Sequence, residues 1–402
     1  MNIKNICVVG LGYIGLPTAA LLANNKFNVI GVDNDINVVK IINKGQIHIV
    51  EPELDSYVLH AKESNFLNAY HEPLEADVFM ICVPTPFRNK NSPEPNLDYV
   101  YAAVDSISKV IKPGNILILE STSPIGTTEN IKNKLKENRV DADSIYIAYC
   151  PERVLPGNII NELVENDRIV GGINQESTKI VSNFYRSFVK GKILETNSKT
   201  AEMCKLTENS FRDVNIAFAN ELSLICEDHD INVSELIALA NRHPRVNILE
   251  PGVGVGGHCI SVDPWFLVAS NPNESKLIKM ARDVNNSKPD WVVKKILEIV
   301  SDKFSNNTKI ACLGLSFKPD IDDLRESPAL YITEKLENTC YSIIAVEPNI
   351  TNHKNLKLRK INEAIKEADV ICCLVGHSEF KRNLDMIRNS KKLILDFCGL
   401  LN

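Results

Sequence analysis

The sequence predicts an α/β protein in which two doubly wound parallel-sheet units are joined by a helical segment. Three observations predict this fold. Strand-like and helix-like runs alternate up to about residue 157, the apolar residues from Thr200 to about His229 take the period of one long helix, and strand and helix patterns alternate again from Lys309. The 402 residues exceed what one hydrophobic core usually serves. We therefore expect three domains, at residues 1–199, 200–303 and 304–402.

The first unit opens with strand, turn, helix and strand. Gly10, Gly12 and Gly15 form G-x-G-x-x-G between strand and helix, and Asp33 closes the second strand about 20 residues on. In such a turn the glycines permit a tight bend, admit a pyrophosphate to the backbone and let the helix pack on the strand. Asp33 can accept hydrogen bonds from ribose hydroxyls, and no cation for a 2′-phosphate follows it. The pattern predicts a Rossmann-like domain that binds NAD rather than NADP; a purely structural turn is the alternative.

Three further apolar strands each end in a small polar loop, at 77–86, 116–128 and 144–157. Ligands of a parallel sheet lie beyond the carboxyl ends of its strands. We therefore expect Thr85 and Thr122 to face the cofactor and Glu152 and Arg153 to face the substrate, with turn formation as the alternative role. Residues 89–96 are expected to form an exposed loop.

The long helix carries Lys205, Asn209 and Arg212 at i, i+4 and i+7, and therefore on one face. Such a stripe is often simply solvated. Here the later turns are apolar around much of the circumference, which favours burial, for example between subunits. A buried cation requires an anionic partner, such as a diphosphate. We expect at least a dimer, either a homodimer or a homotetramer through the 200–229 helix.

A glycine-rich loop, EPGVGVGGHCISVDPW at 250–265, surrounds Cys259 with four glycines and continues to Asp263. Reactive cysteines lie in ordered polar loops, whereas most of the other ten cysteines lie in apolar runs typical of a core. Cys259 is therefore a candidate nucleophile, and a bystander thiol is the alternative. His258 is not expected to act as its base, because chain neighbours usually point apart.

Cationic residues gather near this loop and after the first strand of the last unit. His243 and Arg245 belong to NRHPRVN, and Lys318 and Arg325 stand between a strand and a helix. Guanidinium groups and helix starts both favour phosphate or carboxylate.

The composition excludes several classes. A net charge of -6 gives no support to nucleic-acid binding, and no apolar run approaches the roughly 18 residues of a membrane span. Eleven cysteines without CxxC or HExxH spacing argue against a disulfide framework and against a structural metal. We expect a cytoplasmic protein with reduced thiols and no metal.

A set of motifs in this order resembles the UDP-glucose/GDP-mannose dehydrogenase family along the whole chain. The motifs are GLGYIGLPTA, STSPIGTTE, YCPERVLPG, DRIVGG, AEMCKLTENSFRDVNIAFANELS, ANRHPRVN, PGVGVGGHCISVDPWF and GLSFKPDIDDLRESPA. CPERVLPG and NRHPRVN look like the N-acetylmannosamine branch. Val253 stands where relatives often have proline, which bears on the rigidity of the loop.

The resemblance implies oxidation of the C6 hydroxyl of a UDP-sugar, UDP-N-acetyl-D-mannosamine in that branch, to a carboxylate. It implies Lys205 and Cys259 as catalytic residues. The implied NAD contacts, besides the glycines, are Tyr13, Ile14, Asp33, Thr85, Thr122 and Arg325. The implied UDP-sugar contacts are Arg153, Val154, Lys205, Asn209, Arg212, His243, Arg245, Gly256 and Lys318.

The chemistry itself requires a nucleophile. An aldehyde is planar and yields a second hydride only after a nucleophile makes its carbon tetrahedral, which the Cys259 thiolate can do by forming a thiohemiacetal and then a thioester. Lys205 is a candidate to ionise the thiol, to act as acid or base, or to hold an oxyanion together with Asn209. Asp263 and Glu152 are candidates to position the hydrolytic water.

Other functions remain open at this level. A two-electron dehydrogenase of the 3-hydroxyacid or 6-phosphogluconate type shares the glycine fingerprint but has no need of Cys259. A non-catalytic nucleotide-sugar sensor would keep only the pocket. Within the dehydrogenase interpretation, UDP-glucose and UDP-N-acetylglucosamine differ from the N-acetylmannosamine substrate by groups that loops distinguish through shape and one or two hydrogen bonds.

Overall fold

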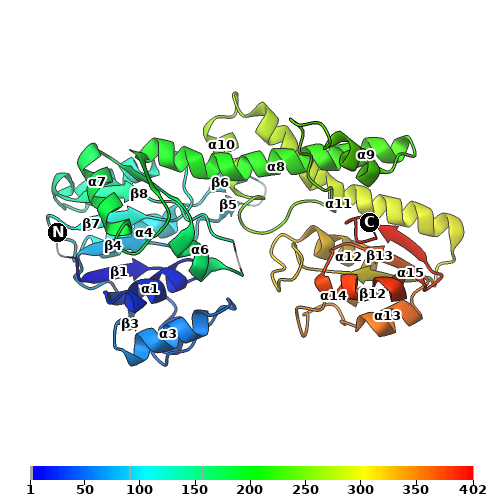
Figure 1. The fold of residues 1–402 in the computed structure, drawn as a ribbon, viewed down its shortest axis with the longest axis horizontal. Coiled ribbons are helices and arrows are strands. Elements are labelled where there is room, and N and C mark those ends of the chain that lie inside the picture. Colours follow the sequence, from blue (N-terminus) through cyan, green and yellow to red (C-terminus); the bar gives the residue numbers. More distant parts are fainter. Residues whose placement is uncertain (1–2, 90–91, 156, 402) are drawn as a thin grey trace. The chain divides into compact units, whose positions relative to one another are not determined.

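A computed structural model describes residues 3–89, 92–155 and 157–401 of the chain. The chain divides into two compact units, Met1–Thr207 and Glu208–Asn402. Each unit contains a mainly parallel sheet with helices on both faces (Figure 1). The α/β class with two doubly wound sheets is therefore confirmed, while the three predicted domain boundaries stay a prediction.

The first unit is built on an eight-stranded sheet of order β10-β9-β8-β7-β4-β1-β2-β3. Its strands are β1 (Asn5–Val9), β2 (Asn28–Val32), β3 (Leu67–Tyr70), β4 (Val78–Ile81), β7 (Ile116–Leu119), β8 (Tyr146–Tyr149), β9 (Arg168–Gly172) and β10 (Ile193–Asn197). The central strands are buried on both faces, which explains why they read as continuous apolar runs.

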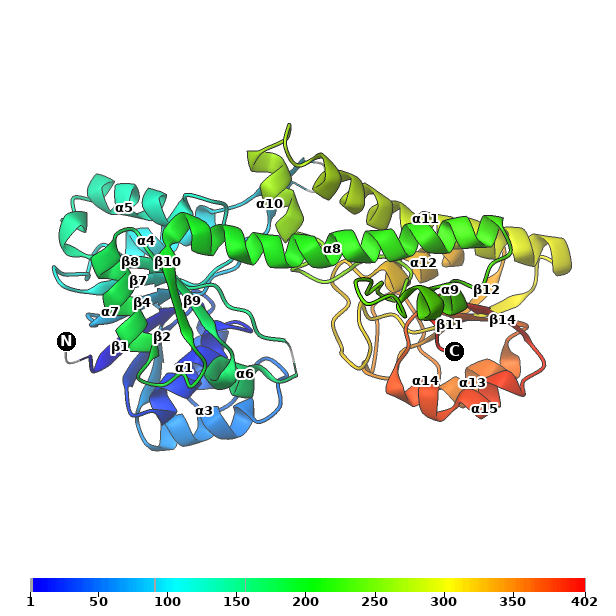
Figure 2. The ribbon, with the colours of Figure 1, turned by 45° about the horizontal axis from the view of Figure 1, so that its top comes forward.

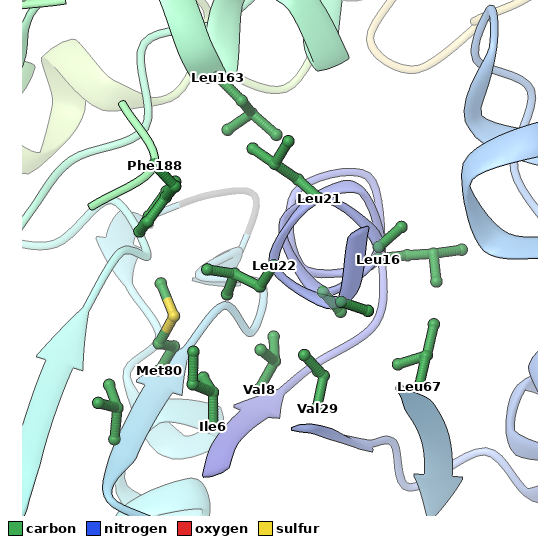
Figure 3. Packing of buried hydrophobic residues seen from close by; sticks show 14 of the residues in the cluster. Ile6, Val8, Leu16, Leu21, Leu22, Val29, Leu67, Met80, Leu163 and Phe188 are labelled. Carbon is green, nitrogen blue, oxygen red and sulfur yellow. The ribbon is translucent and has the colours of Figure 1, made fainter. Parts of the chain in front are cut away.

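Helices cover both faces of this sheet. They are α1 (Gly15–Asn24), α2 (Ile36–Ile42), α3 (Leu54–Glu63), α4 (Asp98–Ile107), α5 (Thr127–Glu137), α6 (Ile159–Glu165) and α7 (Gln175–Tyr185), with a 3₁₀ turn at Ala142–Ser144. On one face Leu16 and Leu22 of α1 pack over Ile6 and Val8 of β1 (Figure 3). Each such fully buried aliphatic side chain contributes about 1.5–3 kcal/mol, and this packing fixes the turn before α1.

One edge of the sheet departs from the parallel pattern. β9 pairs antiparallel with β8, through Ala148 opposite Gly172 and Tyr149 opposite Gly171, and β10 runs parallel to β9. The seven-residue helix α6 is too short to carry the chain back to the amino end of the sheet. The start of β9 therefore lies beside the residues that follow β8.

The second unit contains the rest of the long helix and a smaller sheet (Figure 2). α8 (Ser198–Asp228) begins in the first unit and confirms the predicted long helix, and α11 (Lys276–Lys303) is the other long helix. The remaining elements are α9 (Val233–Ala240), α10 (Asp263–Ser270), β11 (Lys309–Leu313), α12 (Pro328–Glu337), β12 (Ser342–Val346), α13 (Ile361–Glu367), β13 (Val370–Cys373), α14 (Ser378–Arg382), α15 (Leu384–Arg388) and β14 (Leu393–Asp396).

The four strands of this unit form a parallel sheet of order β12-β11-β13-β14. α11 and α12 pack on one face, and α13, α14 and α15 pack on the other. The sheet is thus doubly wound, and the loop after β11 lies at its carboxyl edge, where ligands of such sheets bind.

The segment 89–96, predicted as a loop, contributes to a two-stranded antiparallel hairpin of β5 (Phe87–Asn89) and β6 (Ser92–Pro95). The prediction was wrong for the strand residues, because asparagine and proline make the segment read as a turn while the local pairing overrides that preference. Residues 90 and 91 lie outside the described part. In the described ranges no helix is long and apolar enough to cross a membrane.

Candidate functional site

The turn before α1 has the geometry of a dinucleotide site. Gly10 has a φ of 92°, and a Cβ added there would lie 2.8 Å from the carbonyl oxygen of Cys82. A Cβ on Gly15 would lie 1.7 Å from the carbonyl oxygen of Gly10. A Cβ on Gly12 meets no atom within 4 Å, so the protein itself does not require glycine there. Close approach of a ligand to the backbone is the remaining reason, which fits a bound dinucleotide.

Asp33 follows β2 and is held in place by its own turn. One carboxylate oxygen accepts the amide of Leu11 at 3.0 Å, and the other accepts the amide of Asp35 at 2.9 Å. Asp33 is only partly buried, and a carboxylate oxygen accepts more than one hydrogen bond. Each oxygen therefore keeps acceptor capacity for a ribose hydroxyl.

The structure brings two of the predicted cofactor residues together. The Thr85 hydroxyl, after β4, donates to the carbonyl oxygen of Thr122, after β7, at 2.8 Å. The loop of Thr122 ends at α5, whose first amides are capped from α8: Glu202 accepts the amides of Gly126 at 2.6 Å and Thr128 at 2.8 Å. Sequence reasoning missed Glu202, although it stands three residues before Lys205.

The same turn of α8 places Lys205. Its Nζ donates to the carbonyl oxygen of Glu152 at 2.7 Å, within the loop that follows β8. The Glu152 carboxylate accepts the amide of Arg153 at 2.6 Å and Nη1 of Arg168 at 2.9 Å. Glu152 and Lys205, both predicted as catalytic candidates, therefore lie in contact in the first unit.

A second buried glutamate orders this loop. Glu51, which is 5 % exposed, accepts the amide of Gly157 at 3.0 Å and the amide of Ile159 at 2.9 Å. Sequence reasoning missed Glu51, because 106 residues separate it from Gly157.

In the second unit the glycines of the Cys259 loop pack against the loop after β11. The amide of Gly257 donates to the carbonyl oxygen of Arg325 at 3.0 Å, and a Cβ on Gly257 would lie 2.7 Å from the Phe317 ring. A Cβ on Gly256 would lie 2.5 Å from the carbonyl oxygen of Glu326. The glycines thus allow close packing between two loops. At position 256 this packing explains the glycine, apart from the implied contact with substrate.

Cys259 lies in the turn that opens α10 and is partly buried. Its carbonyl oxygen accepts the amide of Asp263 at 2.8 Å, which fixes the turn. The Asp263 side chain, 3 % exposed, accepts Nδ2 of Asn209 at 2.5 Å. Cys259, Asp263 and Asn209 are therefore joined through one turn and one side-chain hydrogen bond, and their predicted roles stay predictions.

The loop after β11 presents the two predicted cations differently. Lys318 is exposed, and its carbonyl oxygen accepts the hydroxyl of Ser316 at 2.8 Å. Arg325 pairs with Asp323 through Nη2 at 2.6 Å. Burial favours the neutral acid, but the hydrogen bonds of Arg325 hold the pKa of Asp323 below its usual value.

Arg212, His243 and Arg245 lie on the surface of the second unit, and Nδ1 of His243 accepts the amide of Arg245 at 3.3 Å. In the first unit Tyr13, Ile14, Arg153 and Val154 are partly buried beside the loops described above. No group of three or more His, Cys, Asp or Glu residues within the described ranges is arranged to hold a metal ion.

Models of three consecutive domains of one family match the chain. They are the NAD binding domain at residues 4–189, the central domain at 199–287 and the UDP binding domain at 311–402 of the UDP-glucose/GDP-mannose dehydrogenase family. The chain belongs to this family. The resemblance inferred from the motifs is thus confirmed, and the cofactor of this dehydrogenase is NAD.

Individual relatives agree with the family models. A UDP-N-acetyl-D-mannosamine dehydrogenase of Campylobacter jejuni is 58 % identical over 394 residues, covering 94 % of this chain and 96 % of the relative. A protein of the same name from Escherichia coli K12 is 53 % identical, covering 95 % of each chain. The solved UDP-D-ManNAc dehydrogenase of Pyrococcus horikoshii superposes with a TM-score of 0.92 at 38 % identity, covering 99 % of this chain and 96 % of that one.

Proposed function

We propose that this dehydrogenase oxidises UDP-N-acetyl-D-mannosamine to UDP-N-acetyl-D-mannosaminuronate in two steps. The relatives described above are named for that activity, and the similarity to them covers nearly the whole of each chain. The reaction converts one primary alcohol, two NAD and one water into one carboxylate, two NADH and three protons. NAD, when bound, accepts the two hydrides.

The observation that carries the proposal is the setting of Cys259. Cys259 stands in an ordered turn before α10, where its carbonyl oxygen accepts the amide of Asp263, the hydrogen-bond partner of Asn209. In the proposal its thiolate adds to the aldehyde made in the first oxidation, giving a thiohemiacetal whose tetrahedral carbon can lose a second hydride. The resulting thioester is hydrolysed, and the reactive aldehyde is never released.

The other candidates take supporting roles in the proposal. The Lys205 ammonium group, which lies beside the Glu152 loop, stabilises a developing alkoxide. The Asn209 amide donates a hydrogen bond to the oxyanion. Asp263 and Glu152 are the carboxylates assigned to the hydrolytic water. Asp33 and the glycine turn before α1 hold the NAD ribose and pyrophosphate, with Tyr13, Ile14, Thr85, Thr122 and Arg325 as further NAD contacts. Sugar and UDP contacts are assigned to Arg153, Val154, Arg212, His243, Arg245, Gly256 and Lys318.

An oligomer through α8 is part of the proposal. Phe211, Phe218 and Ile225 follow one another at seven-residue intervals and are 68 %, 54 % and 48 % exposed. Side chains at that spacing share one helix face, and an apolar stripe of this kind marks an interaction surface. Its proposed occupant is a second copy of this chain, giving a homodimer or a homotetramer. A cytoplasmic location is also proposed, supported by cysteines that form no disulfide in the described structure.

The test is turnover with a panel of UDP-sugars, with NADH counted per sugar consumed. We expect the highest kcat/KM with UDP-N-acetyl-D-mannosamine and two NADH per uronate. One NADH per sugar would favour a two-electron dehydrogenase, and no turnover with any UDP-sugar would favour a sensor. A preference for UDP-glucose or UDP-N-acetylglucosamine would keep the reaction and change the substrate.

A further inference from the structure

Two buried carboxyl groups in the first unit face a single guanidinium. Glu120 follows β7, Glu152 follows β8, and Arg168 begins β9. All three are at most 8 % exposed. Continuing the antiparallel register of β8 and β9 brings Arg168 opposite Glu152, which explains their contact. We refer to Glu120, Glu152 and Arg168, together with Tyr185 and Cys82, as the Glu120 cluster.

The partners of the two carboxyl groups differ in charge. Glu152 is 2.9 Å from Nη1 of Arg168, whereas the nearest oxygen of Glu120 is 4.0 Å from the same atom. Glu120 instead accepts the hydroxyl of Tyr185 at 2.7 Å and lies 3.3 Å from Sγ of Cys82, both neutral groups. Glu152 therefore forms the closer ion pair with the guanidinium of Arg168.

The charge balance of the cluster allows one carboxylate. A buried uncompensated charge costs several kcal/mol, so one guanidinium supports one ionised carboxyl group. Burial, together with the charge of Glu152, raises the pKa of Glu120, although Arg168 opposes this. Burial disfavours the charge of Arg168, but its acidic neighbours, Glu152 foremost, together outweigh burial and raise the pKa of the guanidinium. The neutral partners of Glu120 and its raised pKa thus favour Glu120, rather than Glu152, as the protonated member.

The remaining titratable groups around Glu120 are neutral as well. Burial raises the pKa of Tyr185 from α7 and of Cys82 after β4 well above their usual values, and it raises the pKa of Cys150 after β8 to about 12. Within the Glu120 cluster, Glu152 and Arg168 are therefore the charged neighbours of Glu120, and the Lys205 ammonium lies next to the cluster, 2.7 Å from the carbonyl oxygen of Glu152.

We propose that Glu120 and Glu152 share one negative charge opposite Arg168, with Glu120 as a positioning residue that ionises when Glu152 is protonated. This inference rests on the proposed function, in which Glu152 accepts a proton from the hydrolytic water. An O–H bond forms at Glu152, and the O–H bond of Glu120 breaks, its proton passing to solvent. The cluster keeps its charge throughout, so Glu152 can be protonated without leaving a buried guanidinium alone.

The first test is Glu120→Gln, which keeps the shape of the neutral acid but cannot ionise. Protonating Glu152 in this variant leaves Arg168 uncompensated. Thioester hydrolysis is expected to slow about tenfold or more. The acid limb of the pH–rate profile for thioester hydrolysis is expected to move to lower pH by about one unit or more. Rapid mixing should then show a burst of two NADH per active site followed by slow turnover. The matched control is Glu165→Gln, at an exposed glutamate of α6 that pairs with Lys190.

A purely structural role for Glu120 predicts a different result. It would lower Tm and turnover together and leave the acid limb in place, and that outcome would overturn the proposal. An assay of the wild type distinguishes a failure of this inference from a failure of the proposed function. If the wild type makes no uronate, the function is wrong; if it does and Glu120→Gln keeps its pH profile, only the shared charge is wrong.

The second test leaves Glu120 intact and so remains decisive if Glu120→Gln does not fold. In Glu152→Gln the guanidinium loses its carboxylate, and Glu120 is expected to ionise. The infrared difference between wild type and Glu152→Gln at neutral pH should therefore contain the carboxylic acid C=O band of one residue. Other acids whose pKa burial raises, Glu202 and Asp213, cancel in the difference. A difference spectrum with no acid band and the loss of one carboxylate would refute the inference.

Discussion

At the residue scale the assignment with most consequence is the nucleophile. Replacing Cys259 with serine removes the thiolate but keeps the turn before α10, because the turn is made by backbone hydrogen bonds. We expect Cys259→Ser to lower uronate formation by about 10³-fold or more while NAD binding is unchanged. Quenched-flow product analysis and NAD titration measure both. Cys340→Ser, at an exposed cysteine, is the control and should turn over normally. Equal rates for the two variants would exclude the thioester route.

Asp33 supports a second prediction at this scale. Its carboxylate retains acceptor capacity toward a ribose diol, and one charged hydrogen bond contributes about 1.5–3 kcal/mol. We expect Asp33→Ala to raise the KM for NAD about tenfold or more while changing the KM for the UDP-sugar much less. The matched control is Asp35→Ala, because the Asp35 side chain caps α2 by accepting the amide of Asn37. A larger effect on the sugar than on NAD would contradict the assignment.

At the element scale the Cys259 loop depends on glycines that let it pack closely against the loop after β11. Gly257 has a φ of 82°, and a Cβ there would lie against the Phe317 ring. We expect Gly257→Ala to cost about 2 kcal/mol, from backbone strain and overpacking, and to lower the Tm of a unit of this size by about 4–8 °C. Calorimetry measures the shift. In the same loop Gly252→Ala is the control, since its Cβ would meet no atom within 4 Å.

The elements also separate what the sequence can predict from what it cannot. Helix α8, the first βα turn and the central strands were predictable, because each depends on local periodicity or on glycine spacing. The pairing of Arg168 with Glu152 was not, because it depends on the antiparallel register of β8 and β9. Glu120 carried one signal, an acid that directly follows an apolar strand, which the predicted role of Thr122 two residues later obscured. Glu51 and Glu202 act on partners 106 and 76 residues away, which no local pattern encodes.

At the scale of the whole molecule the proposed oligomer depends on the exposed stripe of α8. Phe218 lies in the middle of that stripe and is 54 % exposed, so an aspartate there is tolerated by one chain but not by an apolar interface. We expect light scattering to give at least a dimer for the wild type and a monomer for Phe218→Asp. Tyr99→Asp makes the same change at an exposed aromatic of α4 and should leave the mass unaltered. A wild-type monomer would mean that the stripe serves another partner, and an oligomer that survives Phe218→Asp would move the interface away from α8.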